Sequence, residues 1–132
     1  MSAILTRPQR VGAVLKNELW REIGYCRKTV DVAVVSGMKV GAVLYDAAGT
    51  LTLVDVANTA AAEAILIDDS VYDLAAGTHA LTVLFRGPAA VSAAALSYAA
   101  DVDTALEKTA VNAALEAATG IAIYDGMPVY SV

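Results

Sequence analysis

Few side chains in this sequence are suited to catalysis. The chain contains one His, His79, and one Cys, Cys26, and they lie far apart in the sequence. A nucleophilic Cys or Ser needs an adjacent base and a third group that orients this base. No recognisable Ser or Cys nucleophile motif accompanies His79. We therefore interpret Cys26 as an unreactive thiol and His79 as a surface or edge residue of a strand.

Three carboxylates, Asp68, Asp69 and Asp73, form an acidic cluster after an apolar segment. Carboxylate oxygens are ligands for hard cations, but the cluster lacks the regular spacing of a calcium-binding loop. We interpret the cluster as a solvated acidic turn. The alternative is a small metal-dependent enzyme that uses these three residues together with His79.

Other kinds of site are excluded by residue counts and motifs. A single Cys cannot form an internal disulfide, and one Cys with one His cannot build a thiolate or multi-histidine zinc site. The glycine-rich motifs that cradle phosphates are absent from the sequence. We therefore expect no cofactor, no metal and no enzymatic activity.

The composition predicts one small domain that gains stability from association. The chain has 132 residues, of which 58% are hydrophobic, and 28 are Ala while Phe and Trp occur once each. Burial stabilises in proportion to apolar area, at roughly 25 cal/mol per Å², so a core of small side chains contributes little per residue. Oligomerisation would supply the missing area.

Charge is distributed unevenly along the chain. Residues 1–39 carry a net charge of +4, whereas residues 40–132 carry −9. This asymmetry is typical of a basic arm that reaches a partner from an acidic body. An acidic body would be repelled by nucleic acid, and no apolar run is long enough to span a bilayer. We expect a protein partner, with neither nucleic acid nor membrane.

The sequence divides into an arm, residues 1–24, and a single β-rich domain, residues 25–132. The arm contains Pro8, Gly12 and Gly24 and shows no sustained period. We expect it to be partly disordered alone and to become ordered on contact with a partner. Its candidate contact residues combine one cation with apolar side chains, namely Arg10, Val11, Val14, Leu15, Leu19 and Trp20.

Short apolar segments separated by turns predict a compact, mainly antiparallel β body after the arm. The strands are expected at 29–35, 40–45, 51–56, 62–67 and 79–85. Asp46-Ala47-Ala48-Gly49 predicts a tight hairpin, because Gly accepts a positive φ. Residues 88–92 are expected to form an edge piece, since Pro88 cannot donate to a sheet ladder.

One helix is predicted, over residues 101–119. Asp101 or Asp103 is expected to cap its start, and Gly120 stands where a helix commonly ends. An Ala-rich face would pack on the sheet or on another subunit, and its residues are Val102, Leu106, Ala110, Ala113, Ala114 and Ala117. Asp125-Gly126 predicts a terminal hairpin within residues 121–132.

Three segments, in this order, resemble the tailed-phage head decoration proteins of the lambda protein D type. The first is GYCRKTVDVAVVSGMKVGAVLYD, which resembles the entry of that family into its fold. The second is AEAILIDDSVYDLAAGTHALTVLFRGPAAVSAAALSY, and the third is the Ala-rich ALEKTAVNAALEAATGIAI. Together they span about residues 24–123. The longer arm, the linker near Asn58 and the segment after Ile123 depart from the family pattern.

The resemblance implies a fold and a function. It implies a β-clip-like body that forms a homotrimer and binds the major capsid protein at the three-fold sites of an expanded head. There it would act as a cement on the outer surface of the virion, after synthesis in the host cytoplasm. It also implies that the N-terminal arm adds a strand to the capsid. The alternative within the same class is a tail or baseplate adaptor.

Overall fold

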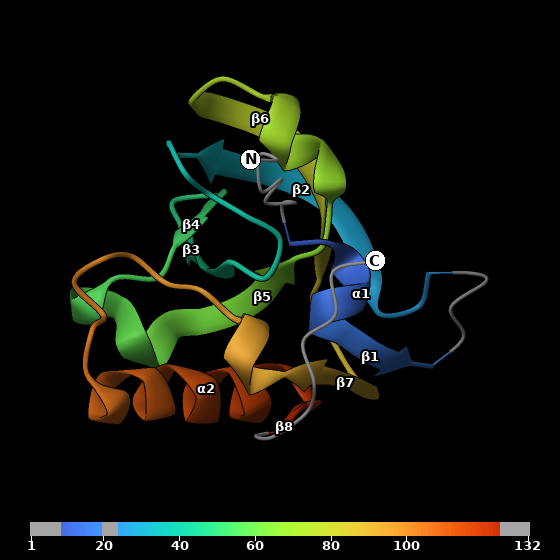
Figure 1. The fold of residues 1–132 in the computed structure, drawn as a ribbon, viewed down its shortest axis with the longest axis vertical. Helices are drawn as coiled ribbons and strands as arrows, with labels where there is room; N and C mark the ends of the chain where they lie inside the picture. The colour runs from blue at the N-terminus through green and yellow to red at the C-terminus, as the bar shows by residue number, and fades with distance from the viewer. Residues whose placement is uncertain (1–8, 20–23, 125–132) are drawn as a thin grey trace, which may run out of the picture.

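The computed structural model describes residues 9–19 and 24–124, and it confirms a mainly β protein with one main C-terminal helix (Figure 1). Five strands form a closed barrel in the order β2-β4-β3-β5-β6. Their bounds are β2 Arg27–Val34, β3 Val43–Ala47, β4 Thr50–Leu53, β5 Ala62–Leu66 and β6 Gly77–Leu84. Each corresponds to a segment that the sequence predicts as a strand.

The barrel is built from strands with alternating side chains. In β2, Val32 and Val34 are buried, whereas Thr29 and Asp31, which precede them on the opposite face, are exposed, as expected for a strand with one face toward solvent. Neighbouring strands pair antiparallel except at one point, where Val32 of β2 faces Leu51 of β4 in a parallel contact. Leucine, isoleucine and valine side chains fill the interior, among them Leu44, Ile65, Leu81 and Val83.

The predicted hairpin turn joins β3 to β4. Ala48 and Gly49 both have positive φ, of 55° and 94°, as a two-residue type I′ loop requires. The Asp46 carboxylate accepts a hydrogen bond of 2.7 Å from the Gly49 amide and thereby closes the turn. This turn is therefore confirmed, with a non-glycine residue in the left-handed region.

A second sheet of three strands lies beside the barrel in the order β1-β7-β8 (Figure 1). Its strands are β1 Leu15–Glu18, β7 Ala89–Ser92 and β8 Ile121–Tyr124. β7 pairs antiparallel with β1 and parallel with β8, so it is the central strand and the predicted edge position is wrong. Pro88 precedes the first residue of β7, so its missing N–H removes no bond from this ladder.

The main helix, α2, spans Ala105–Thr119 and runs along one side of the body. Thr104 caps its start, not Asp101 or Asp103, because Glu107 lies three residues later and completes a reciprocal capping box. The helix ends at Gly120, which has a φ of 74° as predicted.

The buried face of α2 differs from the predicted one. Val111 and Leu115 are fully buried, whereas Leu106 is 81% exposed and Ala110, Ala113 and Ala117 are exposed as well. Burial follows the larger side chains, because they bring more apolar area than Ala. Of the predicted face, Val102 is buried just before the helix and Ala114 is half-buried.

Short helical segments complete the described chain. They are α1 Val11–Val14, η2 Val56–Ala61, η3 Asp69–Asp73 and η4 Ala93–Ala95. The predicted terminal hairpin within residues 121–132 stays a prediction, because β8 pairs with β7 and residues 125–132 lie outside the described residues. The β-clip likeness implied by the resemblance stays a prediction.

Candidate functional site

The first described residue is fastened to two distant segments of the body. The Gln9 side-chain amide donates hydrogen bonds to the carbonyl oxygens of Val40, at 2.7 Å, and Ala95, at 2.6 Å. The Tyr72 hydroxyl donates to the Gln9 carbonyl and accepts a hydrogen bond of 3.1 Å from the Val40 amide. Partial burial raises the pKa of Tyr72. Residues 9–19 of the predicted arm therefore begin with a polar anchor on the body.

The short helix α1 is seated in the core of the chain. Ala13 and Val14 have no exposed surface, and Val14 belongs to the main hydrophobic cluster. Gly41 permits this packing, because a Cβ at this position would lie 2.3 Å from the Ala95 carbonyl oxygen and 3.1 Å from a Val14 methyl group. The described part of the arm thus packs against the body of its own chain. That the arm becomes ordered on contact with a partner stays a prediction.

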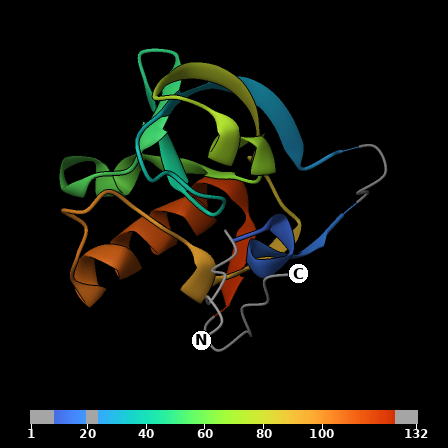
Figure 2. The same cartoon turned by 45° about the horizontal axis from the view of Figure 1, so that its top comes forward.

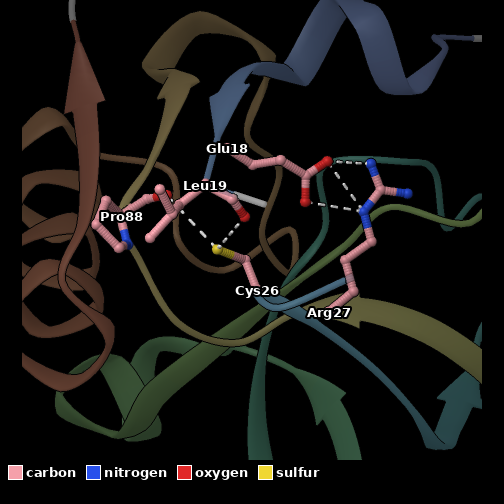
Figure 3. A network of polar contacts seen from close by, with 5 residues as sticks. All are labelled: Glu18, Leu19, Cys26, Arg27 and Pro88. Carbon is pink, nitrogen blue, oxygen red and sulfur yellow. Dashed lines mark hydrogen bonds and ion pairs between the residues drawn. The ribbon is translucent and has the colours of Figure 1, made fainter. Parts of the chain in front are cut away.

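The end of β1 is held to the start of β2 by charged and weakly polar contacts (Figure 3). The Glu18 carboxylate pairs with the Arg27 guanidinium, and this hydrogen-bonded pairing raises the pKa of Arg27. The buried Cys26 thiol donates to the carbonyl oxygens of Leu19, at 3.7 Å, and Pro88, at 3.5 Å. The Leu19 amide donates to Pro88 at 2.9 Å. The Cys26 thiol thus has a structural role, because it links the start of β2 to the end of β1 and to the residue before β7.

One face of the three-stranded sheet points outward and carries small or apolar side chains. The register places Asn17 beside Ala90 and Ala90 beside Ala122, while the alternate residues Val91 and Ile121 are buried. Leu19, 37% exposed, and Tyr124, 51% exposed, border this face. A hollow of about 350 Å³ lies over it. Sequence reasoning missed Asn17, Ala90, Ala122 and Tyr124, although the alternation in IAIY could have indicated the last two.

The sheet also has an open edge in the described chain. β1 pairs with β7 on one side and with no other strand of residues 9–19 and 24–124 on the other. Unpaired backbone groups on such an edge can bind an additional strand from a partner. Figure 2 shows α1 and β1 together at the side of the body, away from most of the barrel.

The predicted contact residues of the arm differ in exposure. Arg10 is exposed and Leu19 partly exposed, whereas Val11 and Leu15 are half-buried. Val14 is inside the core and cannot touch a partner while α1 stays docked. Trp20 lies outside the described residues.

The acidic cluster has a local structural role in the described part of the chain. Asp68 caps η3 by accepting hydrogen bonds from the Ser70 amide, at 3.0 Å, and from the Ser70 hydroxyl, at 2.7 Å. It also accepts one from the Thr82 amide at 3.1 Å. Partial burial raises the pKa of Asp68, but these hydrogen bonds outweigh it and hold the pKa below its ordinary value.

The geometry gives no support to the alternative of a metal-dependent enzyme. Among residues 9–19 and 24–124, no group of three or more His, Cys, Asp or Glu side chains is placed to hold a metal ion. His79 instead makes a hydrogen bond of 2.9 Å with the Ala75 carbonyl oxygen. Within the same residues, none of the helices has the length and apolar character needed to cross a bilayer.

Comparison with known proteins identifies the family. The family model described as Bacteriophage lambda head decoration protein D matches residues 4–121. The chain belongs to this family. The resemblance found from the sequence is thereby confirmed, and head decoration protein D is a structural phage protein that is not known as an enzyme. Membership implies that the chain is a capsid decoration protein at the surface of a phage head. Neither the search of curated proteins nor the search of solved structures found a match.

Proposed function

We propose that this decoration protein binds the outer surface of the expanded head at its three-fold sites, as a homotrimer, and stabilises the head against internal genome pressure. Its partner there is the major capsid protein. The observation that carries the proposal is the match of a head decoration family over residues 4–121. The Ala-rich sequence, for which association would supply additional buried apolar area, supports the oligomeric state.

The capsid-contacting surface in this proposal is the N-terminal segment together with the outward face of the β1-β7-β8 sheet. Its open edge at β1 is suited to pair with a capsid strand through backbone hydrogen bonds. The small side chains of Ala90 and Ala122 allow close approach, and Leu19 and Tyr124 add exposed apolar area. Arg10 and Leu19 contact the capsid directly, while Val14 holds the segment in place from the core.

Three copies of this surface on one trimer would act together. Association costs about 4–15 kcal/mol in lost translational and rotational freedom, so a single copy of this surface binds weakly. Binding of the first segment raises the effective concentration of the other two. Each trimer would then clamp neighbouring capsid subunits without catalysing a reaction.

The direct test adds the purified protein to undecorated expanded heads and images them by electron microscopy. We expect density at the three-fold sites and heads that withstand higher temperature than undecorated ones. In whole particles mixed with the protein, density at the tail or baseplate alone would instead support the adaptor alternative. Heads that bind no protein at all would contradict the proposal.

A matched pair of variants tests the contact surface. Ala122→Arg places a large charged side chain on the outward sheet face and should abolish decoration. Ala76→Arg adds the same side chain at an exposed position outside this sheet, and it should leave decoration unchanged. Circular dichroism confirms that both variants fold. Equal decoration by the two variants would exclude this face as the contact.

A further inference from the structure

Two aromatic rings and two cations gather where β2 begins and β6 ends. The β2–β6 register places Arg27 opposite Leu84, and the Phe85 amide continues the ladder by donating to the Cys26 carbonyl at 2.9 Å. Arg86 Nε donates to the Tyr25 carbonyl at 2.7 Å. We call the surface of Tyr25, Lys28, Phe85 and Arg86 the basic–aromatic patch.

The cations of this patch are held in place by the rings. The Arg86 guanidinium lies 3.9 Å from the centroid of the Tyr25 ring and 4.8 Å from that of Phe85. The Lys28 ammonium lies 4.6 Å from the centroid of the same Phe85 ring. Cation–π contacts of this kind orient a charge without neutralising it. Both cations therefore remain available as charges, and both residues are exposed.

The two charges are close together and lack a carboxylate in the described chain. Because both lie within 5 Å of one ring centroid, they are at most about 10 Å apart, roughly one Debye length at 0.1 M salt. The one ion pair among residues 9–19 and 24–124 joins Arg27 to Glu18. Lys28 and Arg86 thus repel each other, and a carboxylate bound near both of them would offset this repulsion.

The geometry of the patch also favours binding of a carboxylate. The Arg86 side chain is fixed at Nε and at its planar face, so little conformational entropy is lost when its remaining N–H groups bind a partner. A guanidinium fork matches the two oxygens of a carboxylate. In addition, Arg27, next to Lys28, binds Glu18 of β1, so the patch adjoins the proposed capsid-contacting surface.

From these observations we propose that the basic–aromatic patch binds an acidic segment of the capsid protein and forms a second contact beside the N-terminal segment. This inference rests on the proposed function. A short acidic polypeptide segment fits better than nucleic acid, because it can place its few charges at the patch alone, whereas a long phosphate polymer would also bring charge against the remaining acidic body, whose residues from 40 onward carry −9.

The first experiment tests the patch without capsids. A hexaglutamate peptide is titrated into the full-length protein, and amide shifts are followed by NMR spectroscopy. We expect saturable shifts centred on residues 25–28 and 84–87 that weaken as salt is added. The double variant Lys28→Gln/Arg86→Gln should lose about tenfold or more in affinity, because charge-assisted hydrogen bonds are removed.

Charge-matched and conservative variants complete this experiment. Lys39→Gln/Lys108→Gln removes two exposed cations outside the patch and should leave peptide affinity unchanged. Arg86→Lys keeps the charge but not the fork, so it should lose part of the affinity, and it serves as the test variant if the double variant fails to fold. Shifts centred elsewhere, equal affinity of all variants, or tighter binding of an oligothymidine than of hexaglutamate would overturn the proposal.

The second experiment measures binding of the same variants to undecorated heads. The double variant should bind about tenfold more weakly than the parent protein and show a shallower salt dependence. If the parent protein decorates heads and the double variant does so with equal affinity, the patch proposal fails and the proposed function stands. If the parent protein binds hexaglutamate at the patch but no head, the proposed function fails.

Discussion

Adding one methyl group at Gly41, as in Gly41→Ala, should disturb the packing of the N-terminal segment against the body. Its φ is +99°, and an added Cβ would lie 2.3 Å from the Ala95 carbonyl oxygen and 2.9 Å from Gln9 Nε2. The Gly41 backbone has little freedom to move away, because its amide donates to Leu66 at 2.8 Å and its carbonyl accepts from Ser97 at 3.0 Å. We therefore expect Gly41→Ala to displace the Gln9 or Val14 side chain or to strain the backbone.

The expected magnitude has three contributions. Left-handed backbone costs a residue other than Gly roughly 1–2 kcal/mol, and overpacking in a filled core costs roughly 1–3 kcal/mol. The smaller entropy of the unfolded chain returns roughly 0.4–1 kcal/mol. The free energy of unfolding should therefore fall by about 2–4 kcal/mol.

Gly49→Ala is the matched control. Gly49 has nearly the same φ, +94°, but no atom lies within 4 Å of its added Cβ. It should lose about 1 kcal/mol from backbone strain alone. Urea denaturation measures both variants, and hydrogen exchange at the Ala13 amide, which is bonded to Arg10 at 3.0 Å, reports whether α1 is released. Equal destabilisation of the two variants, with Ala13 equally protected, would refute the steric argument.

Three further predictions concern turns, caps and pH. Ala48→Asn should raise the free energy of unfolding by roughly 0.5–1 kcal/mol, because Asn tolerates the φ of 55° better than Ala; a lower melting temperature would contradict this. The lowered pKa of Asp68 adds stability above its ordinary value of 3.8, and this stability is lost as pH falls through the folded-state pKa. Asp68→Asn should therefore flatten the loss of stability between neutral and acidic pH in urea titrations, and an unchanged slope would speak against it. Thr104→Ala should cost about 1 kcal/mol through loss of the α2 cap, whereas Thr104→Ser should restore most of it in thermal unfolding.

The strands and the family could be inferred from the sequence, because they depend on local signals. Alternation in TVDVAVV, the apolar run HALTVLF and the Ala48-Gly49 turn each predict structure from residues close in the chain. The three segments that indicated the decoration family are likewise recognised from local sequence and from their order along the chain. Recognising the family requires the residue types and the spacing of these segments, but no knowledge of which strands pair.

The tertiary structure decided which segments meet, and this changed the interpretation of the arm. Val14 is buried because residues distant in sequence, Gly41 and Ala95, leave room for its side chain in the core. No local sequence pattern near Val14 indicates this packing. In the same way, β7 became a central strand only because β1 and β8 approach it from opposite ends of the chain.

The candidate contact surfaces also combine properties visible in the sequence with an arrangement that only the tertiary structure sets. The apolar and basic character of residues 10–19 is visible in the sequence, but the outward sheet face combines residues from three strands. The basic–aromatic patch likewise joins Lys28 to Phe85 and Arg86 through the β2–β6 pairing. Side-chain chemistry is a local property of the sequence, whereas the distances between these side chains depend on long-range strand pairing, which single-sequence periodicity does not encode.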